Sequence, residues 1–157
     1  MTGRVFLARP LSDVAEPAPL DELCRSLSAE LHAAGWTVSP VREAVPPDGG
    51  RALVAGNVAG ILGSDLLLVV GEPGTTSSIW VEVGVALAGG VPVAVLARPG
   101  DRLPFLVEQA AGDAPSPGLA PLLVVRHDVR DVVAPVAELD ARPVALVHEV
   151  LTWHAAL

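Results

Sequence analysis

Glu82 is the single charged residue in the stretch "SSIWVEVGVALAGG" (77–90), which is otherwise apolar or small. A carboxylate held in an apolar crevice beside hydroxyl side chains can act as a nucleophile toward an electrophilic sugar carbon. Two structural interpretations stand beside this one. Glu82 could be a first-turn acid stabilised by the helix dipole, worth about 0.3–1 kcal/mol, or the solvent-facing residue of a mostly buried helix. A capping box does not explain it, because Ser78 would need its acid at Val81.

Further polar residues precede this helix or follow the strands. Thr76, Ser77 and Ser78 could donate hydrogen bonds to a phosphate or sugar hydroxyl at the helix N-terminus, or could simply cap the helix. Arg9 follows the first expected strand and Arg98 follows the fourth. Each arginine could be a solvated loop residue or an anion anchor that favours a nucleotide over a nucleoside.

Short apolar runs alternate with helix-like segments along the chain. The patterns predict strands at 4–8, 36–40, 65–71, 91–97 and 121–128, and helices at 20–35, 49–64, 77–90, 102–112 and 141–157. Continuous apolar strands are typical of parallel sheets covered on both faces. We therefore expect one domain, 1–157, of the α/β class: a flavodoxin-like, doubly wound, five-stranded parallel sheet with helices on both faces.

Ligands of such sheets bind beyond the carboxyl ends of the strands, where the strand order reverses. Ala8, Arg9, the segment 71–78 and Arg98 all follow or end strands, so they should gather at that edge. Glu82 lies near the start of the helix that begins there. Its side chain should therefore face the same crevice.

Composition and charge exclude several classes of function. The net charge is −8, lysine is absent and aromatic residues make up 3% of the chain, which argues against binding nucleic acid. No apolar run reaches about 18 residues, so no membrane span is expected. The N-terminus lacks the pattern of a signal peptide and Cys24 is the single cysteine, so the cytoplasm is the expected location. The four histidines are scattered, which makes a metal site unexpected.

Three segments together resemble the nucleoside 2-deoxyribosyltransferase superfamily, which includes N-glycosidases that hydrolyse nucleoside monophosphates. They are "RVFLARPLSD", "NVAGILGSDLLLVV" and "SSIWVEVGVALAGGVPVAVLARPGDRLPFLVEQAAG". The resemblance covers nearly the whole chain, and "EVGVALAGG" is its most specific part. It implies that Glu82 is the nucleophile that attacks the anomeric carbon and forms a glycosyl-enzyme intermediate. It also implies no metal or cofactor, and a homodimer or higher homo-oligomer in which the neighbouring subunit helps to close each site.

The sequence departs from the family pattern at several supporting positions. Asn57 stands where the family usually has an acid, and an amide can hydrogen-bond a hydroxyl but cannot transfer a proton. Phe6 replaces a tyrosine near the end of the first strand, and Arg9 replaces a glycine. Pro104 falls near a serine or asparagine that the neighbouring subunit contributes in related enzymes. The resemblance therefore implies Glu82 and Asn57 as catalytic positions. Together with the residues expected at the carboxyl edge of the sheet, the resemblance gives the expected substrate contacts: Phe6, Ala8, Arg9, Thr76, Ser77, Ser78 and Arg98.

Three functions remain open. The first is cleavage or transfer of the N-glycosidic bond of a nucleoside or nucleoside monophosphate, with Glu82 as nucleophile. The second is cleavage of NAD at its nicotinamide ribosyl bond, because "SSIWVE" also looks like the Ser/Trp/Glu region of TIR-type domains. The third is a non-catalytic nucleotide-binding module, favoured by Asn57, Phe6 and Pro104. Each takes a small nucleoside or nucleotide as its partner, and catalysis itself is left undecided by the sequence.

Overall fold

The computed structural model describes residues 2–10, 17–40, 50–71, 78–111, 118–126 and 141–157. Its strands are β1 (Arg4–Ala8), β2 (Thr37–Pro40), β3 (Leu66–Val70), β4 (Val93–Ala97) and β5 (Leu122–Arg126). Its helices are α1 (Pro17–Ala33), α2 (Gly50–Leu62), α3 (Ile79–Ala88), α4 (Phe105–Ala110) and α6 (Ala141–Ala155).

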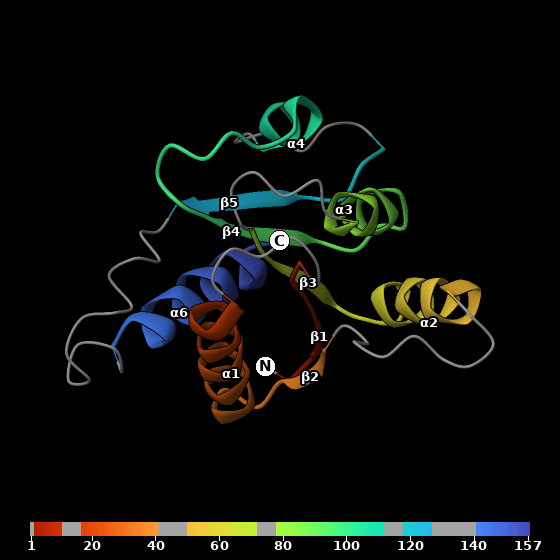
Figure 1. Ribbon diagram of the computed structural model, residues 1–157. Helices are drawn as coiled ribbons and strands as arrows, with labels where there is room; N and C mark the ends of the chain where they lie inside the picture. Colours follow the sequence, from red (N-terminus) through yellow and green to blue (C-terminus); the bar gives the residue numbers. More distant parts are fainter. Residues whose placement is uncertain (1, 11–16, 41–49, 72–77, 112–117, 127–140) are drawn as a thin grey trace.

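The five strands form one parallel sheet in the order β2-β1-β3-β4-β5. In Figure 1, α1 and α6 cover one face of this sheet, and α2, α3 and α4 cover the other. Strand β2 pairs with one edge of β1, and β3 pairs with its other edge. The order therefore reverses between β1 and β3, which is where a flavodoxin-like fold opens its ligand crevice.

Two apolar layers hold the sheet between its helices. One contains Leu27 and Leu31 of α1 with Val147 and Val150 of α6, and the other contains Ile61 of α2 with side chains of α3 and α4. Every residue of β3 and of β4 is buried. Strands covered on both faces need apolar residues at every position, which explains the uninterrupted runs "LLLVV" and "VAVLA".

The end of α3 sets the angle at which the chain enters β4. Gly90 has φ +80°, and the amide of Val91 donates to the carbonyl of Ala86 at 2.9 Å. This Schellman arrangement requires a left-handed residue, which glycine adopts without a steric penalty. The expected stop at Gly89–Gly90 is thus confirmed.

The expected flavodoxin-like α/β fold is confirmed by the sheet order and by the helices on both faces. Helix α4 is shorter than its expected range of 102–112. It begins after Pro104, because a proline disfavours helical geometry in the residue before it. Within the described ranges, no helix combines the length and apolarity that crossing a bilayer requires.

Replacing Leu27 by alanine tests the α1 side of the core. Leu27 is fully buried between α1 and the sheet. We expect Leu27→Ala to lower the free energy of unfolding by about 3 kcal/mol, because it removes apolar contacts and leaves a cavity. Val144→Ala, at a half-exposed position of α6, is the control and should change it by less than about 1 kcal/mol. Urea unfolding followed by circular dichroism measures both, and equal effects would contradict the assignment of Leu27 to the core.

Candidate functional site

A cavity of about 280 Å³ lies along α2 and α3, with Arg9 from the carboxyl end of β1 at its edge. Helix α2 contributes five lining residues, α3 contributes three, and Ser78 lies just before α3. The residues of α2 are Leu53, Val54, Asn57, Val58 and Ile61, and those of α3 are Val81, Glu82 and Val85. Most of these side chains are apolar. Asn57, Ser78 and Glu82 are the polar groups that the two helices present to it.

Helical periodicity brings the lining residues of each helix to one face. Leu53, Asn57 and Ile61 are spaced four residues apart on α2. Glu82 and Val85 follow Ser78 at intervals of four and three on α3. Residues at these spacings lie above one another on a helix. Because α2 and α3 pack side by side, these two faces meet at the cavity.

Glu82 is buried, with 9% of its surface exposed. Its Oε1 accepts a hydrogen bond from Nδ2 of Asn57 at 3.1 Å. The second carboxylate oxygen of Glu82, Oε2, and the amide oxygen of Asn57, Oδ1, are buried without a hydrogen-bond partner in the described part of the chain. Glu82 is therefore not the solvent-facing residue of its helix. The two open acceptors suit a ligand that carries hydroxyl donors.

Burial and hydrogen bonding act on the Glu82 carboxyl in opposite directions. Burial raises its pKa above the ordinary value of 4.5, because an apolar environment disfavours the charged form. The hydrogen bond from Asn57 lowers the pKa and offsets part of this effect. A carboxyl with a perturbed pKa in a cavity is typical of a functional site.

Arg9 forms an ion pair with Asp21 of α1 and is largely buried. Its guanidinium thus carries a positive charge to the edge of the cavity while a carboxylate balances it. A phosphate that reached this edge would bind Arg9 alongside the Asp21 carboxylate or would displace that carboxylate from Arg9. The structure is compatible with the anion-anchor interpretation, and it excludes a freely solvated loop arginine.

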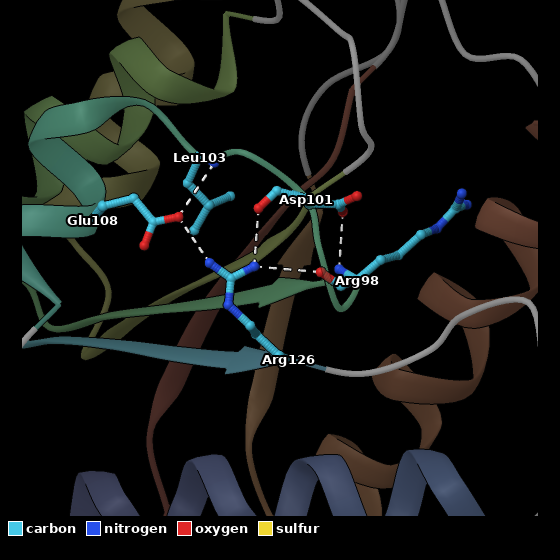
Figure 2. Close-up of polar contacts among 5 residues, drawn as sticks. All are labelled: Arg98, Asp101, Leu103, Glu108 and Arg126. Atoms are coloured by element: carbon cyan, nitrogen blue, oxygen red, sulfur yellow. Dashed lines mark hydrogen bonds and ion pairs between the residues drawn. The ribbon is translucent and has the colours of Figure 1, made fainter.

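Arg98 follows β4 in a turn that a second arginine fixes. Figure 2 shows the Arg126 guanidinium between Glu108 and this turn. Arg126 donates to the carbonyls of Arg98 at 3.4 Å and of Asp101 at 3.0 Å, and pairs with Glu108 at 2.7 Å. Gly100 has φ +85°, and the Asp101 carboxylate accepts from the Arg98 amide at 2.9 Å. The Arg98 side chain extends away from this cluster (Figure 2) and does not line the cavity.

The structure brings some of the expected site residues together and not others. Glu82, Asn57, Ser78 and Arg9 line one cavity. Ser78 precedes α3 but its side chain makes no capping hydrogen bond; its carbonyl accepts from Val81 and Glu82 instead. Thr76 and Ser77 lie outside the described residues.

Phe6 and Ala8 of β1, which were expected to contact the substrate, are not among the described residues that line the cavity. Phe6 and Ala8 are buried in the core. The Phe6 ring lies so close to α2 that a Cβ on Gly60 would approach it to 2.7 Å. Their roles as substrate contacts stay predictions.

Sequence reasoning missed the apolar wall of the cavity and the partner of Arg9. The wall was detectable in principle, since Leu53, Val58 and Ile61 share the helical face that carries Asn57. Nothing in the sequence pattern links Arg9 to Asp21, which belongs to another element.

Polar contacts at the amino ends of β1 and β3 join elements of the fold and lie outside the cavity. The Asp65 carboxylate accepts a hydrogen bond from the Arg4 amide at 2.8 Å. Nε2 of His154 lies 3.1 Å from the Asp65 carbonyl, and its ring packs edge-on against Trp36. Within the described ranges, no three histidine, cysteine, aspartate or glutamate side chains gather closely enough to hold a metal ion.

Comparison with solved structures identifies proteins of the same fold. The Clostridium botulinum CMP N-glycosidase BcmB is 20% identical, with a TM-score of 0.59 over 88% of this chain and 98% of that one. A 2-deoxyribosyltransferase from Bacillus psychrosaccharolyticus is 16% identical, with a TM-score of 0.58 over 87% and 95%. The solution structure of BlsM is 19% identical, with a TM-score of 0.60 over 94% and 91%.

These three neighbours belong to the nucleoside 2-deoxyribosyltransferase-like superfamily. The similarity confirms, at the level of the fold, the resemblance read from the sequence. No protein-family model matches the chain, and no curated protein matches it by sequence.

Replacing Glu82 by glutamine tests the cost of burying its charge. In the folded protein the pKa of Glu82 is raised above 4.5, so this carboxyl ionises at a lower pH in the unfolded chain than in the folded one. The free energy of unfolding therefore falls as the pH rises from about 4.5 through the folded-state pKa of Glu82. Glutamine keeps the shape and does not titrate. We expect Glu82→Gln to melt at a higher temperature than the parent at neutral pH, with the difference shrinking as the pH falls below this window.

Melting temperatures measured from pH 4 to pH 8 provide the test. Glu149→Gln, on the exposed face of α6, is the control for removing a surface carboxylate. A parent that is more stable than Glu82→Gln at neutral pH would contradict a desolvated carboxylate at this position.

Proposed function

We propose that the protein cleaves or transfers the N-glycosidic bond of a nucleoside or nucleoside monophosphate, with Glu82 as the nucleophile. One observation carries the proposal: Glu82 is a buried carboxylate whose Oε2 has no hydrogen-bond partner among the described residues, in a cavity at the switch point of the sheet. The fold is shared with an N-glycosidase and a deoxyribosyltransferase, which supports the reaction class.

In this proposal each polar group of the cavity has a role. Asn57 holds Oε1 of Glu82 through Nδ2, which orients the carboxylate and leaves Oε2 to attack the anomeric carbon. Oδ1 of Asn57 can accept a hydrogen bond from a sugar hydroxyl. The attack expels the base and forms a glycosyl-enzyme ester, which water resolves in hydrolysis or a second base resolves in transfer. The apolar wall excludes water from the reacting atoms and receives the base.

A homodimer or larger homo-oligomer in the cytoplasm belongs to the same proposal. Two apolar residues of the cavity wall are exposed, Val54 by 62% and Val81 by 68%. Apolar side chains exposed next to a cavity support coverage by another subunit.

Base release is the direct test of the nucleophile. We expect the purified protein to release free base from at least one nucleoside or nucleoside monophosphate of a panel that also contains NAD. Glu82→Gln should lower the rate by at least about a thousandfold, because an amide cannot form the glycosyl ester. Chromatography of the products measures both, and a melting curve of the variant controls for folding.

The alternatives are separated by the same panel. Release of nicotinamide alone would identify a NAD glycohydrolase. Nucleotide binding without base release, and unchanged in Glu82→Gln, would contradict the proposed activity and indicate a non-catalytic binding module.

Arg9→Gln tests whether the cavity edge recognises a phosphate. If Arg9 contacts the phosphate, the variant should raise the KM for a nucleoside monophosphate roughly tenfold, the loss of one charge-assisted hydrogen bond. The KM for the matching nucleoside should stay unchanged. Arg25→Gln, which removes an exposed arginine of α1, is the control. An equal rise in KM for both substrates would instead assign Arg9 to holding α1 through Asp21.

A further inference from the structure

The described lining of the cavity holds two ionisable side chains. Among the described residues that line it, Glu82 alone carries a carboxyl, and Arg9 is the other ionisable side chain. Arg9 is engaged with Asp21. Asn57 is an amide that donates a hydrogen bond to Glu82. The side chain beside the proposed nucleophile therefore holds the carboxylate but cannot exchange a proton with a substrate.

Cleaving a glycosidic bond usually takes two carboxyl groups. One attacks the anomeric carbon, and the other protonates the leaving group as it departs. Glu82 cannot attack as a carboxylate and donate a proton in the same step. A base that carries a fixed positive charge avoids this difficulty, because it takes the bond's electron pair and leaves as a neutral molecule.

The electrostatics of the cavity favour the same class of base. Oε2 of Glu82 is buried without a hydrogen-bond partner in the described residues, and its surroundings are largely apolar. A buried charge is stabilised by an opposite charge beside it, and the attraction is stronger in an apolar environment than in water. A cationic base next to Oε2 would keep Glu82 ionised and nucleophilic. A neutral base would remove water from the carboxylate without compensating its charge.

We propose that this cavity acts on N-glycosides whose base carries a fixed positive charge, such as a pyridinium riboside or an N7-alkylated purine nucleotide. The inference rests on the proposed N-glycosidic cleavage by Glu82 and names its substrate class. Oε2 of Glu82 bonds to the anomeric carbon while the carbon–nitrogen bond breaks, and the electron pair neutralises the ring nitrogen. Water then attacks the anomeric carbon, gives its proton to the solvent and restores the carboxylate.

Two matched substrate pairs test whether the cavity prefers a positively charged base. N7-methylated guanosine monophosphate is compared with guanosine monophosphate, and nicotinamide mononucleotide with its neutral dihydro form. We expect kcat/KM to be roughly a hundredfold higher for the charged member of each pair, the usual contribution of a general acid that a neutral base would need. Rates are corrected for uncatalysed breakdown of each compound, because charged bases also leave faster in water.

Two variants at Asn57 test whether the preference for a charged base depends on this side chain. Asn57→Asp places a carboxyl beside Glu82 at nearly constant shape. We expect it to cleave the neutral member of each pair at least about tenfold faster than the parent does, and so to narrow the charged-to-neutral ratio. Asn57→Leu removes the amide without adding an acid and should give no such gain. Circular dichroism verifies that both variants fold.

The outcomes separate this inference from the activity on which it rests. Equal kcat/KM values within each pair overturn the charge selection and leave N-glycosidic cleavage standing. A ratio unchanged in Asn57→Asp overturns the role of Asn57. Release of base from no member of either pair, nor from any other nucleoside or nucleotide, overturns the cleavage activity and this inference with it.

Discussion

The buried carboxylate of Glu82 is the constraint on which the organisation of the site depends. A charge taken out of water into an apolar wall destabilises the fold unless polar groups compensate it, and here one amide hydrogen bond compensates it in part. That bond joins α2 to α3 at the cavity. The cavity can form because the two helices lie side by side on the same face of the sheet. The compensation is incomplete, because Oε2 of Glu82 has no hydrogen-bond partner among the described residues.

The sheet order decides where this carboxylate can act. The order reverses between β1 and β3, and the helices that follow these strands, α1 and α3, lie on opposite faces of the sheet. Sheets of this kind bind ligands at the carboxyl ends of the strands beside such a reversal. Helix α3 begins at that edge and places Glu82 close to its own start. Arg9 reaches the same edge from the end of β1. Positive and negative groups from distant parts of the chain thus meet around one apolar cavity.

Asn57 shows that a shared fold does not determine the chemistry of a site. The backbone arrangement is shared with an N-glycosidase and a 2-deoxyribosyltransferase at 16–20% identity. The side chain beside Glu82 is nevertheless an amide, which keeps the hydrogen bond and gives up proton transfer. A fold fixes where a nucleophile stands, whereas the residues around it decide which leaving groups it can expel.

The sequence by itself determined the fold class and the exceptional position of Glu82. Strands buried on both faces require continuous apolar runs, so "LLLVV" and "VAVLA" were recognisable without a structure. A single acid in an apolar helix was recognisable for the same reason. The end of α3 was predictable because Gly90 meets a local requirement for positive φ.

Only the tertiary structure decided which partners these residues have. Asn57 and Glu82 are 25 residues apart, and no local pattern states that their helices pack with these faces together. The same holds for Arg9 with Asp21 and for Arg126 with the turn after β4. Periodicity and turn chemistry report the conformation of a short segment. The distance between side chains on different elements depends on how the whole chain packs, which no single segment encodes.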